Sequence, residues 1–297
     1  MTALYSTCDN DPDLCRNDDK TRALQPSLPK SARLPINHCN LPAVILGSLT
    51  FQRHPTPLVL DGVAELHLDL FARLDHLRLP QQRAELFRDY MTVAFRLEHP
   101  EEIGFTDHAN KGRNNRVKAT WMRVIRGWAF DPDGREAAVL KGWVESRFGL
   151  TPRHHGSALH DPNSEAYHRY AVMRAEGLYG TNALEAQLDL VFTYCQYELK
   201  RTAADATHLT LYRGVNRVDA HEELDADASS QRILLLNNIS SFSSERERAG
   251  EFGDYILCVE VPIAKVLFHC SLLPGVLQGE GEYLVIGGAY EVSWATL

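Results

Sequence analysis

Two glutamates stand two residues apart near the C-terminus, where an acidic, glycine-containing segment leads into an apolar one. Residues 278–286 read QGEGEYLVI. In an extended chain, residues i and i+2 project from the same face, so Glu280 and Glu282 could both reach one bound molecule. Gly279 and Gly281 leave the backbone free to take conformations that other residues rarely adopt. An ordinary charged turn before a strand would give the same pattern, so this segment needs support from elsewhere in the chain.

A second candidate is an arginine followed at once by a glycine. Leu209–Tyr212 alternates as a half-buried strand does, and Arg213 and Gly214 come directly after it. A guanidinium offers a planar fork that suits phosphate or carboxylate, and a neighbouring glycine lets a ligand approach the backbone. On these residues alone, a solvent-exposed arginine at a strand end is the simpler interpretation.

A third candidate is the serine-rich segment 239–244, which reads ISSFSS and is followed by ERERAGEFG. Ser244 and Glu247 have the spacing of a capping box, which predicts a strand carrying hydroxyl groups and then a short helix. Ala249 and Phe252 are three residues apart and are expected to pack that helix down onto the fold.

The elements that must position these residues change character along the chain. Apolar residues recur in steps of three and four before residue 205, which predicts helices at about 63–77, 81–97, 108–130, 136–147, 164–176 and 183–200. In the first of these, Val63, Leu66, Leu70, Leu74 and Leu77 are expected to face inward. Short strand-like segments follow, at Leu209–Tyr212, Ile233–Leu236, Tyr255–Val261, Lys265–Phe268, Tyr283–Ile286 and Tyr290–Trp294.

This order predicts an α+β fold, with a helical N-terminal two-thirds packed on a mixed or antiparallel β core. We expect an irregular leader over 1–40, a mainly helical part over 41–205 and a β-rich catalytic core over 206–297. The last two parts are expected to form one compact unit.

The segment 108–130 is unusual because it contains six lysines or arginines and no acidic residue in a chain of net charge −8. The basic residues are Lys111, Arg113, Arg116, Lys118, Arg123 and Arg126. Such a face is often simply solvated, but it could dock an acidic partner. Trp121 and Trp128 belong to the apolar stripe of the same segment, and we interpret them as core residues.

Composition excludes several classes of protein. An acidic chain is a poor general binder of nucleic acid, and no apolar run approaches the length of a membrane span or a signal sequence. Six cysteines without C-x-x-C spacing favour a reduced, cytoplasmic protein. His154, His155 and His160 share one loop but lack the spacing of metal ligands, so no metal site is predicted. The chain also lacks a P-loop and a G-x-G-x-x-G fingerprint.

The order of the three candidates is itself informative. Arg-Gly at a strand end, Ser-x-Ser before a short helix and Glu-x-Glu before a strand together resemble the arginine–serine–glutamate class of mono-ADP-ribosyltransferases, over roughly residues 207–297. As a whole, including the helical part and the segment 111–128, the chain is similar to the dinitrogenase reductase ADP-ribosyltransferases, which switch off nitrogenase in some nitrogen-fixing bacteria. The resemblance implies two small sheets around a cleft for NAD, which is the substrate, and no metal. It also implies an arginine of nitrogenase Fe protein as acceptor and a PII-type signalling protein as regulator.

The resemblance assigns roles to individual residues. Those implied to bind NAD are Arg213, Gly214, Ser241, Ser243 and Phe252, and those implied to be catalytic are Ser241, Glu280 and Glu282. Arg213 would hold a phosphate, the backbone of Gly214 would meet the nicotinamide amide, and Ser241 would orient NAD and the catalytic glutamate. Ser243 is implied to be chiefly structural. Phe242 replaces the middle threonine of the family's motif, which leaves the packing there unpredicted.

The chemistry of NAD cleavage accounts for two carboxylates. Departure of nicotinamide builds positive charge on the ribose, as in glycoside hydrolysis, and Glu282 would stabilise that charge while holding the 2′-hydroxyl. An acceptor arginine is protonated, with a pKa above about 12. Glu280 would hold its guanidinium in line and help to remove the proton.

Three alternatives stay open at this point. In another register Glu280 is catalytic and Gln278 faces the acceptor; we prefer Glu282 because Tyr283 begins the apolar strand directly after it. The same site could pass ADP-ribose to water, as an NAD glycohydrolase does. The fold could also serve as a binding module that senses NAD without catalysis.

Overall fold

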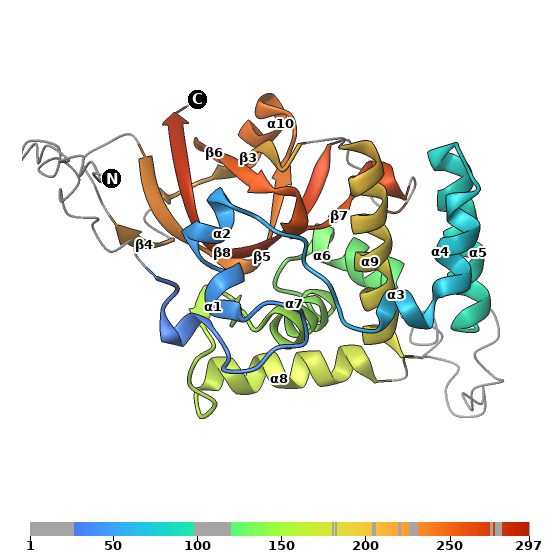
Figure 1. Cartoon of the computed structure of the whole chain (residues 1–297). Helices are drawn as coiled ribbons and strands as arrows, with labels where there is room; N and C mark the ends of the chain where they lie inside the picture. The colour runs from blue at the N-terminus through green and yellow to red at the C-terminus, as the bar shows by residue number, and fades with distance from the viewer. Residues whose placement is uncertain are drawn as a thin grey trace, which may run out of the picture.

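The computed structural model describes residues 27–97, 120–179, 181, 183–203, 206–218, 221–225, 231–273, 276 and 281–296. Among the described residues, helices predominate as far as residue 202 and antiparallel strands predominate after it, so the α+β fold class is confirmed. In Figure 1 the six main strands gather in the upper half of the view, α7 and α8 lie below them, and α9, α4 and α5 lie to the right.

The helices have the order expected from their apolar periodicity. They are α1 (Ala43–Leu46), α2 (Leu49–Arg53), α3 (Val63–Leu66), α4 (Leu68–Asp75), α5 (Pro80–Ala94), α6 (Trp121–Phe130), α7 (Arg135–Phe148), α8 (Glu165–Leu178), α9 (Leu184–Thr202) and α10 (Arg246–Gly250). Local signals set several ends. Pro80 opens α5, where its missing N–H costs nothing, and Gly149 ends α7 with a left-handed φ of 70°.

The single helix predicted over 63–77 is wrong, because the chain breaks at His67 between α3 and α4. The His67 Nδ1 atom lies 2.9 Å from the Tyr90 hydroxyl, and the two rings meet edge to face. Leu70 and Leu74 are buried as expected, but Leu66 is 80% exposed. The break at His67, where the chain contacts α5, therefore leaves α3 with an orientation in which Leu66 faces solvent and not the core.

The strands are β1 (Arg153–His154), β2 (Ser157–Ala158), β3 (His208–Val215), β4 (Glu222–Asp225), β5 (Gln231–Ser243), β6 (Tyr255–Pro262), β7 (Val266–His269) and β8 (Glu282–Thr296). β1 and β2 form a small hairpin, and the other six form one sheet of order β4-β5-β3-β6-β8-β7. β5 also pairs with β8, and β5 touches β3 through a single pair, Tyr212 and Ser243. The pairings therefore form a closed ring of four strands, in which β5 pairs with β3, β3 with β6, β6 with β8 and β8 with β5.

Two strand predictions differ from the structure. The segments Tyr283–Ile286 and Tyr290–Trp294 belong to one strand, β8, which continues through two glycines. Gly288 has a φ of 115° and lies against the Gly47 backbone, whose carbonyl accepts a hydrogen bond from Ala289 N at 2.8 Å. Lys265 ends a 3-10 turn (Ile263–Lys265) and is not part of β7.

The helical part and the sheet share one large apolar core. The cluster includes Trp143, Phe148 and Phe192 from α7 and α9 together with Phe268 and Leu284 from β7 and β8. Within the described residues, no helix combines the length and apolarity that crossing a membrane requires.

Candidate active site

A cleft of about 680 Å³ contains most of the residues that the sequence singled out. Its lining includes Arg213 and Gly214 of β3, Ser241, Phe242 and Ser243 of β5, Phe252 after α10, and Glu282 at the start of β8. The opposite wall comes from the helical part of the chain, with Trp128 and Phe130 of α6 and Lys141 of α7. A volume of this size is within the range of small-molecule and cofactor sites.

Arg213 and Ser241 are joined directly. The Arg213 Nη1 atom donates to the Ser241 carbonyl at 2.7 Å, and this contact links β3 to β5 close to the single pair between those strands. Burial lowers the pKa of the Arg213 guanidinium, and its buried Nε has no hydrogen-bond partner among the described residues. A buried cation with an unused donor suits an anionic ligand.

Ser241 also meets Glu282. In the register of β5 and β8, Ser243 is opposite Glu282 and Ser241 is opposite Leu284, so these side chains share one face of the sheet. The Ser241 and Glu282 side chains both line the cleft. Burial raises the pKa of Glu282, while the nearby Ser241 hydroxyl and the charge of Arg248 act in the opposite direction.

Gly214 allows β3 to touch the segment after β5. A Cβ at this position would collide with the Ala249 carbonyl oxygen of α10, and one at Gly253 would collide with the backbone of Val215. The two glycines therefore permit backbone-to-backbone contact between β3 and the α10 region, which brings α10 and Phe252 to the edge of the cleft.

The short helix α10 begins differently from the prediction. The capping box of Ser244 and Glu247 is wrong, since Glu245 is the N-cap residue and its side chain makes no capping bond. Instead, the Ser243 hydroxyl accepts a hydrogen bond from Glu245 N at 3.0 Å and shapes the turn. Ala249 is buried as expected, but Phe252 is 69% exposed and lines the cleft, so it does not pack the helix down.

Basic side chains from several elements surround the cleft. Besides Arg213 these are Lys141, Arg153, His221 and Arg248. Burial and, to a smaller extent, the charges of Arg213 and Arg153 lower the pKa of His221 to about 4. The imidazole is therefore neutral at pH 7, and its neighbours make this end of the cleft strongly positive.

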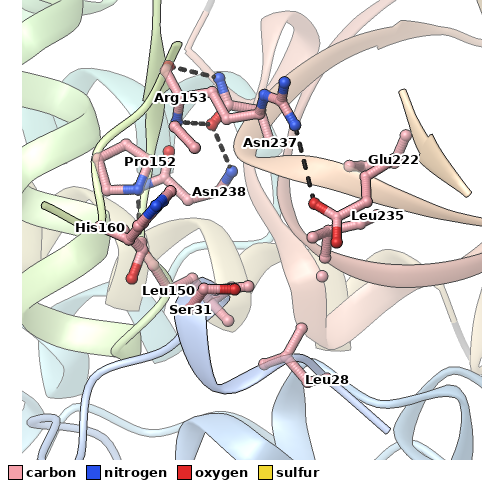
Figure 2. Close-up of a pocket in the computed structure, with 15 residues that line it drawn as sticks. Leu28, Ser31, Leu150, Pro152, Arg153, His160, Glu222, Leu235, Asn237 and Asn238 are labelled. Atoms are coloured by element: carbon pink, nitrogen blue, oxygen red, sulfur yellow. Dashed lines mark hydrogen bonds and ion pairs between the residues drawn. The ribbon is translucent and has the colours of Figure 1, made fainter. Parts of the chain in front are cut away.

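Arg153 is held by the β5 backbone and side chains beside a second, smaller pocket of about 90 Å³. Its N–H donates to the Asn237 Oδ1 atom at 2.8 Å and its carbonyl accepts from Asn237 Nδ2 at 2.9 Å. Figure 2 shows this pair together with Glu222, whose carboxylate lies 3.9 Å from the Arg153 guanidinium. Arg153 and Asn237 line both pockets.

The histidine loop packs against the same region. His154 is buried, with its Nδ1 3.3 Å from Lys141 Nζ, and Lys141 Nζ donates to Asp133 Oδ1 at 2.7 Å. Burial lowers the pKa of His154 to about 4, so it is a neutral partner of Lys141. No group of three or more metal-ligating side chains occurs among the described residues.

Trp128 combines two roles that the sequence did not separate. It belongs to the apolar core with Trp121, as predicted, but its indole Nε1 donates to the Ser241 hydroxyl at 3.0 Å.

The sequence pattern also did not single out four basic residues of this site, Lys141, Arg153, His221 and Arg248. Their only signal in the sequence is basic character, and their meeting at one cleft depends on tertiary contacts.

Several predicted residues lie outside the described part of the chain. They are Gln278, Gly279 and Glu280 of the acidic segment, and Lys111, Arg113, Arg116 and Lys118 of the basic one. Arg123 and Arg126 are described: Arg123 Nη2 lies 2.9 Å from Glu136 Oε1, and Arg126 Nε donates to the Val276 carbonyl at 2.9 Å.

Comparison with known proteins identifies the family. The family model described as dinitrogenase reductase ADP-ribosyltransferase (DRAT) matches residues 36–294. The chain is 38% identical over 260 residues to the NAD(+)–dinitrogen-reductase ADP-D-ribosyltransferase of Rhodospirillum rubrum, covering 86% of this chain and 93% of the relative. No solved structure matches the chain. The match of the family model to most of its length shows that the chain belongs to the dinitrogenase reductase ADP-ribosyltransferase family.

Proposed function

We propose that the protein transfers ADP-ribose from NAD to an arginine of dinitrogenase reductase, the nitrogenase Fe protein, and thereby inactivates it. The observation that carries this proposal is the meeting of Arg213, Ser241 and Glu282 in one cleft, where Arg213 is bonded to the Ser241 carbonyl. The acceptor follows from the relative, whose name gives dinitrogen reductase as its substrate protein. The reaction would take place in the cytoplasm.

Glu282 supplies the charge that bond cleavage requires. As nicotinamide leaves, the ribose carbon becomes positively charged, and a fixed carboxylate stabilises that state more than the ground state. In the free protein, burial raises the pKa of Glu282. The positive nicotinamide ribosyl group of bound NAD would favour the ionised carboxylate again, so substrate binding itself prepares the catalytic charge.

The basic residues provide a site for the two phosphates of NAD. Arg213 keeps one buried donor unused among the described residues, and Arg153 and Arg248 line the same cleft. Guanidinium groups match phosphate oxygens in a planar, two-pronged geometry. We therefore assign the pyrophosphate to this positive end and the nicotinamide ribose to the side of Ser241 and Glu282.

Glu280 would act on the acceptor. It lies outside the described residues, two positions before Glu282. Arginine as acceptor and a PII-type protein as regulator come from the resemblance of the sequence. A carboxylate at position 280 would orient the guanidinium and accept its proton.

The test uses the purified full chain, NAD labelled in its ADP-ribose half, and purified dinitrogenase reductase. We expect label on dinitrogenase reductase, on one arginine located by mass spectrometry, together with stoichiometric release of nicotinamide. Nicotinamide release with no labelled protein would identify an NAD glycohydrolase. NAD binding with no nicotinamide release would identify a binding module, and either result would overturn the proposal.

The Glu280→Gln variant separates the two registers. If Glu282 is catalytic, this variant loses protein labelling but keeps slow NAD hydrolysis, because water does not need the guanidinium-orienting carboxylate. If Glu280 is catalytic, the variant loses both activities and Gln278→Ala weakens labelling. The ratio of labelling to nicotinamide release in each variant distinguishes the two patterns.

A further inference from the structure

We propose that Trp128, a residue of the helical part, is a positioning residue of the catalytic centre, because its indole N–H fixes the hydroxyl of Ser241, which lies on the same face of the sheet as Glu282. This inference rests on the proposed function for its kinetic consequence. The contact that carries it is the hydrogen bond of 3.0 Å from Trp128 Nε1 to Ser241 Oγ.

The direction of each hydrogen bond follows from the chemistry of the groups. An indole nitrogen only donates, so Ser241 Oγ must accept from Trp128. The Ser241 hydroxyl then keeps its own proton to donate, and the Glu282 carboxylate lies on the same face of the two strands and lines the same cleft. Arg213 fixes the other end of the same residue through the Ser241 carbonyl. Ser241 is thus restrained at both its backbone and its hydroxyl.

The indole is itself held in place. Trp128 is 4% exposed and belongs to the apolar core. The Lys141 ammonium lies 5.7 Å from the centre of its ring, a contact that draws electron density toward the ring face and strengthens the N–H as a donor. Lys141 is tied to Asp133 Oδ1 at 2.7 Å, and the same oxygen accepts from His155 N at 2.9 Å. A connected set of contacts therefore runs from the histidine loop through Lys141 and Trp128 to the Ser241 hydroxyl.

A buried tryptophan could contribute to packing alone. A second tryptophan on the same helix, Trp121, allows the two roles to be compared. Trp121 is also on α6 and fully buried, but its indole nitrogen has no hydrogen-bond partner among the described residues. Changing either tryptophan to phenylalanine removes the indole N–H and keeps an aromatic ring. Only the change at Trp128 removes a hydrogen bond to the site, so Trp121→Phe is the matched control.

The kinetic test is a double-mutant cycle on the full chain, measured as nicotinamide release from NAD. We expect Trp128→Phe to lower kcat roughly tenfold, the equivalent of about one hydrogen bond. It should also move the acid limb of the pH–rate profile to higher pH, since the Ser241 hydroxyl, which opposes the raised pKa of Glu282, is then less firmly held. In a Ser241→Ala background the same change should have almost no further effect on kcat. A tenfold loss in both backgrounds, or an equal loss in Trp121→Phe, would mean that Trp128 acts through packing and would overturn the proposal.

A second measurement does not depend on turnover. The indole N–H resonances of the four tryptophans can be followed by NMR in ¹⁵N-labelled protein and assigned with the two Phe variants. We expect the Trp128 resonance to shift in Ser241→Ala and in Glu282→Gln, with the Trp121 resonance unchanged. If the wild-type protein releases no nicotinamide, the proposed function fails, and these shifts still decide whether Trp128 is coupled to Glu282. An unmoved Trp128 resonance in Ser241→Ala refutes the coupling.

Discussion

Replacing Glu282 by glutamine should abolish activity and stabilise the protein at the same time. The substitution keeps the size of the side chain and its ability to accept from Ser241, but it removes the negative charge at the start of β8. Two independent consequences follow, one for the transition state and one for the folded state.

The rate effect can be calculated from the charge. A carboxylate about 4 Å from a ribosyl cation, in a site with an effective dielectric constant of about 20, stabilises that cation by ~4 kcal/mol. Loss of this energy corresponds to about a thousandfold in rate, near the upper end of the effect of removing one oxyanion-hole donor, about 10²–10³. NAD affinity should change much less, because the ground state already binds through the basic end of the cleft.

The stability effect follows from the sign of the pKa shift. Burial raises the pKa of Glu282 in the folded state. The contribution of such a group to stability is complete below its unfolded pKa and is lost as the pH rises through its folded pKa. At pH 8 the wild-type protein therefore contains an unfavourable buried charge that the Glu282→Gln variant lacks. We expect the variant to unfold at a higher temperature at pH 8 and at the same temperature as the wild type near pH 4.

Nicotinamide release and thermal unfolding of the same preparations measure both effects. Glu291→Gln is the matched control, because Glu291 is on the same strand and its partner Arg53 is exposed. This control should change neither rate nor stability by a measurable amount. Turnover within a few-fold of wild type in Glu282→Gln would refute the assignment of the catalytic charge, and unchanged stability at pH 8 would refute the argument from burial.

Three further changes test the framework of the site. Gly214→Ala should cost about 1–3 kcal/mol of stability and raise KM for NAD, because its Cβ would collide with the Ala249 carbonyl. Burial lowers the pKa of Lys265 to about 7, so the folded state loses this proton at a lower pH than the unfolded state does. The free energy of unfolding should therefore rise between pH 7 and 10 in the wild type, and Lys265→Met should remove that rise. Arg83→Met should destabilise the protein by about 3–5 kcal/mol, because it leaves the buried Glu198 carboxylate unpaired.

The changes at Gly214 and Arg83 each have a control within the chain. Gly62→Ala adds a Cβ that has no other atom within 4 Å. This variant therefore tests only the cost of a left-handed backbone at alanine, and we expect it to lower the free energy of unfolding by about 1–2 kcal/mol. Arg201→Met breaks an exposed pair with Asp75 and should cost less than about 1 kcal/mol. Urea unfolding measures the loss of unfolding free energy in the Arg83 and Arg201 variants. Equal losses would contradict the expectation that a buried ion pair is more costly to break than an exposed one. For Lys265, unfolding free energies at pH 7 and pH 10 suffice, and an unchanged pH slope would contradict the low pKa.

The sequence predicted the elements well where one periodicity dominates a long segment. The stripe of α9 and the alternation of β3 are examples, because burial of one face imposes the pattern on the residues. Prediction failed where a single tertiary contact overrides the local pattern, as at His67, or where glycines interrupt a strand without ending it, as in β8. Neither the contact of His67 with Tyr90 nor that of Gly288 with Gly47 has a local signature.

The site shows the same division. Arg213, Ser241 and Glu282 of the candidate site could be predicted from sequence because each lies near the end of a strand-like segment. Trp128, Lys141 and other residues of the opposite wall could not, because their patterns also describe an ordinary helix. The structure thus adds the part of the cleft lining that the helical part provides.

The backbone at Gly281 changes the physical basis of the glutamate pair. Two residues in extended chain project from one face, but Gly281 has a φ of 72° and β8 begins only at Glu282. The Gly281 carbonyl accepts a hydrogen bond from Ser244 N at 3.0 Å, which ties the turn to the end of β5. Glu282 is therefore oriented by the sheet and by the turn at Gly281. If this carboxylate supplies the charge for NAD cleavage, as we propose, a change at Glu280 should affect transfer and spare cleavage, so the two steps can be separated by mutation.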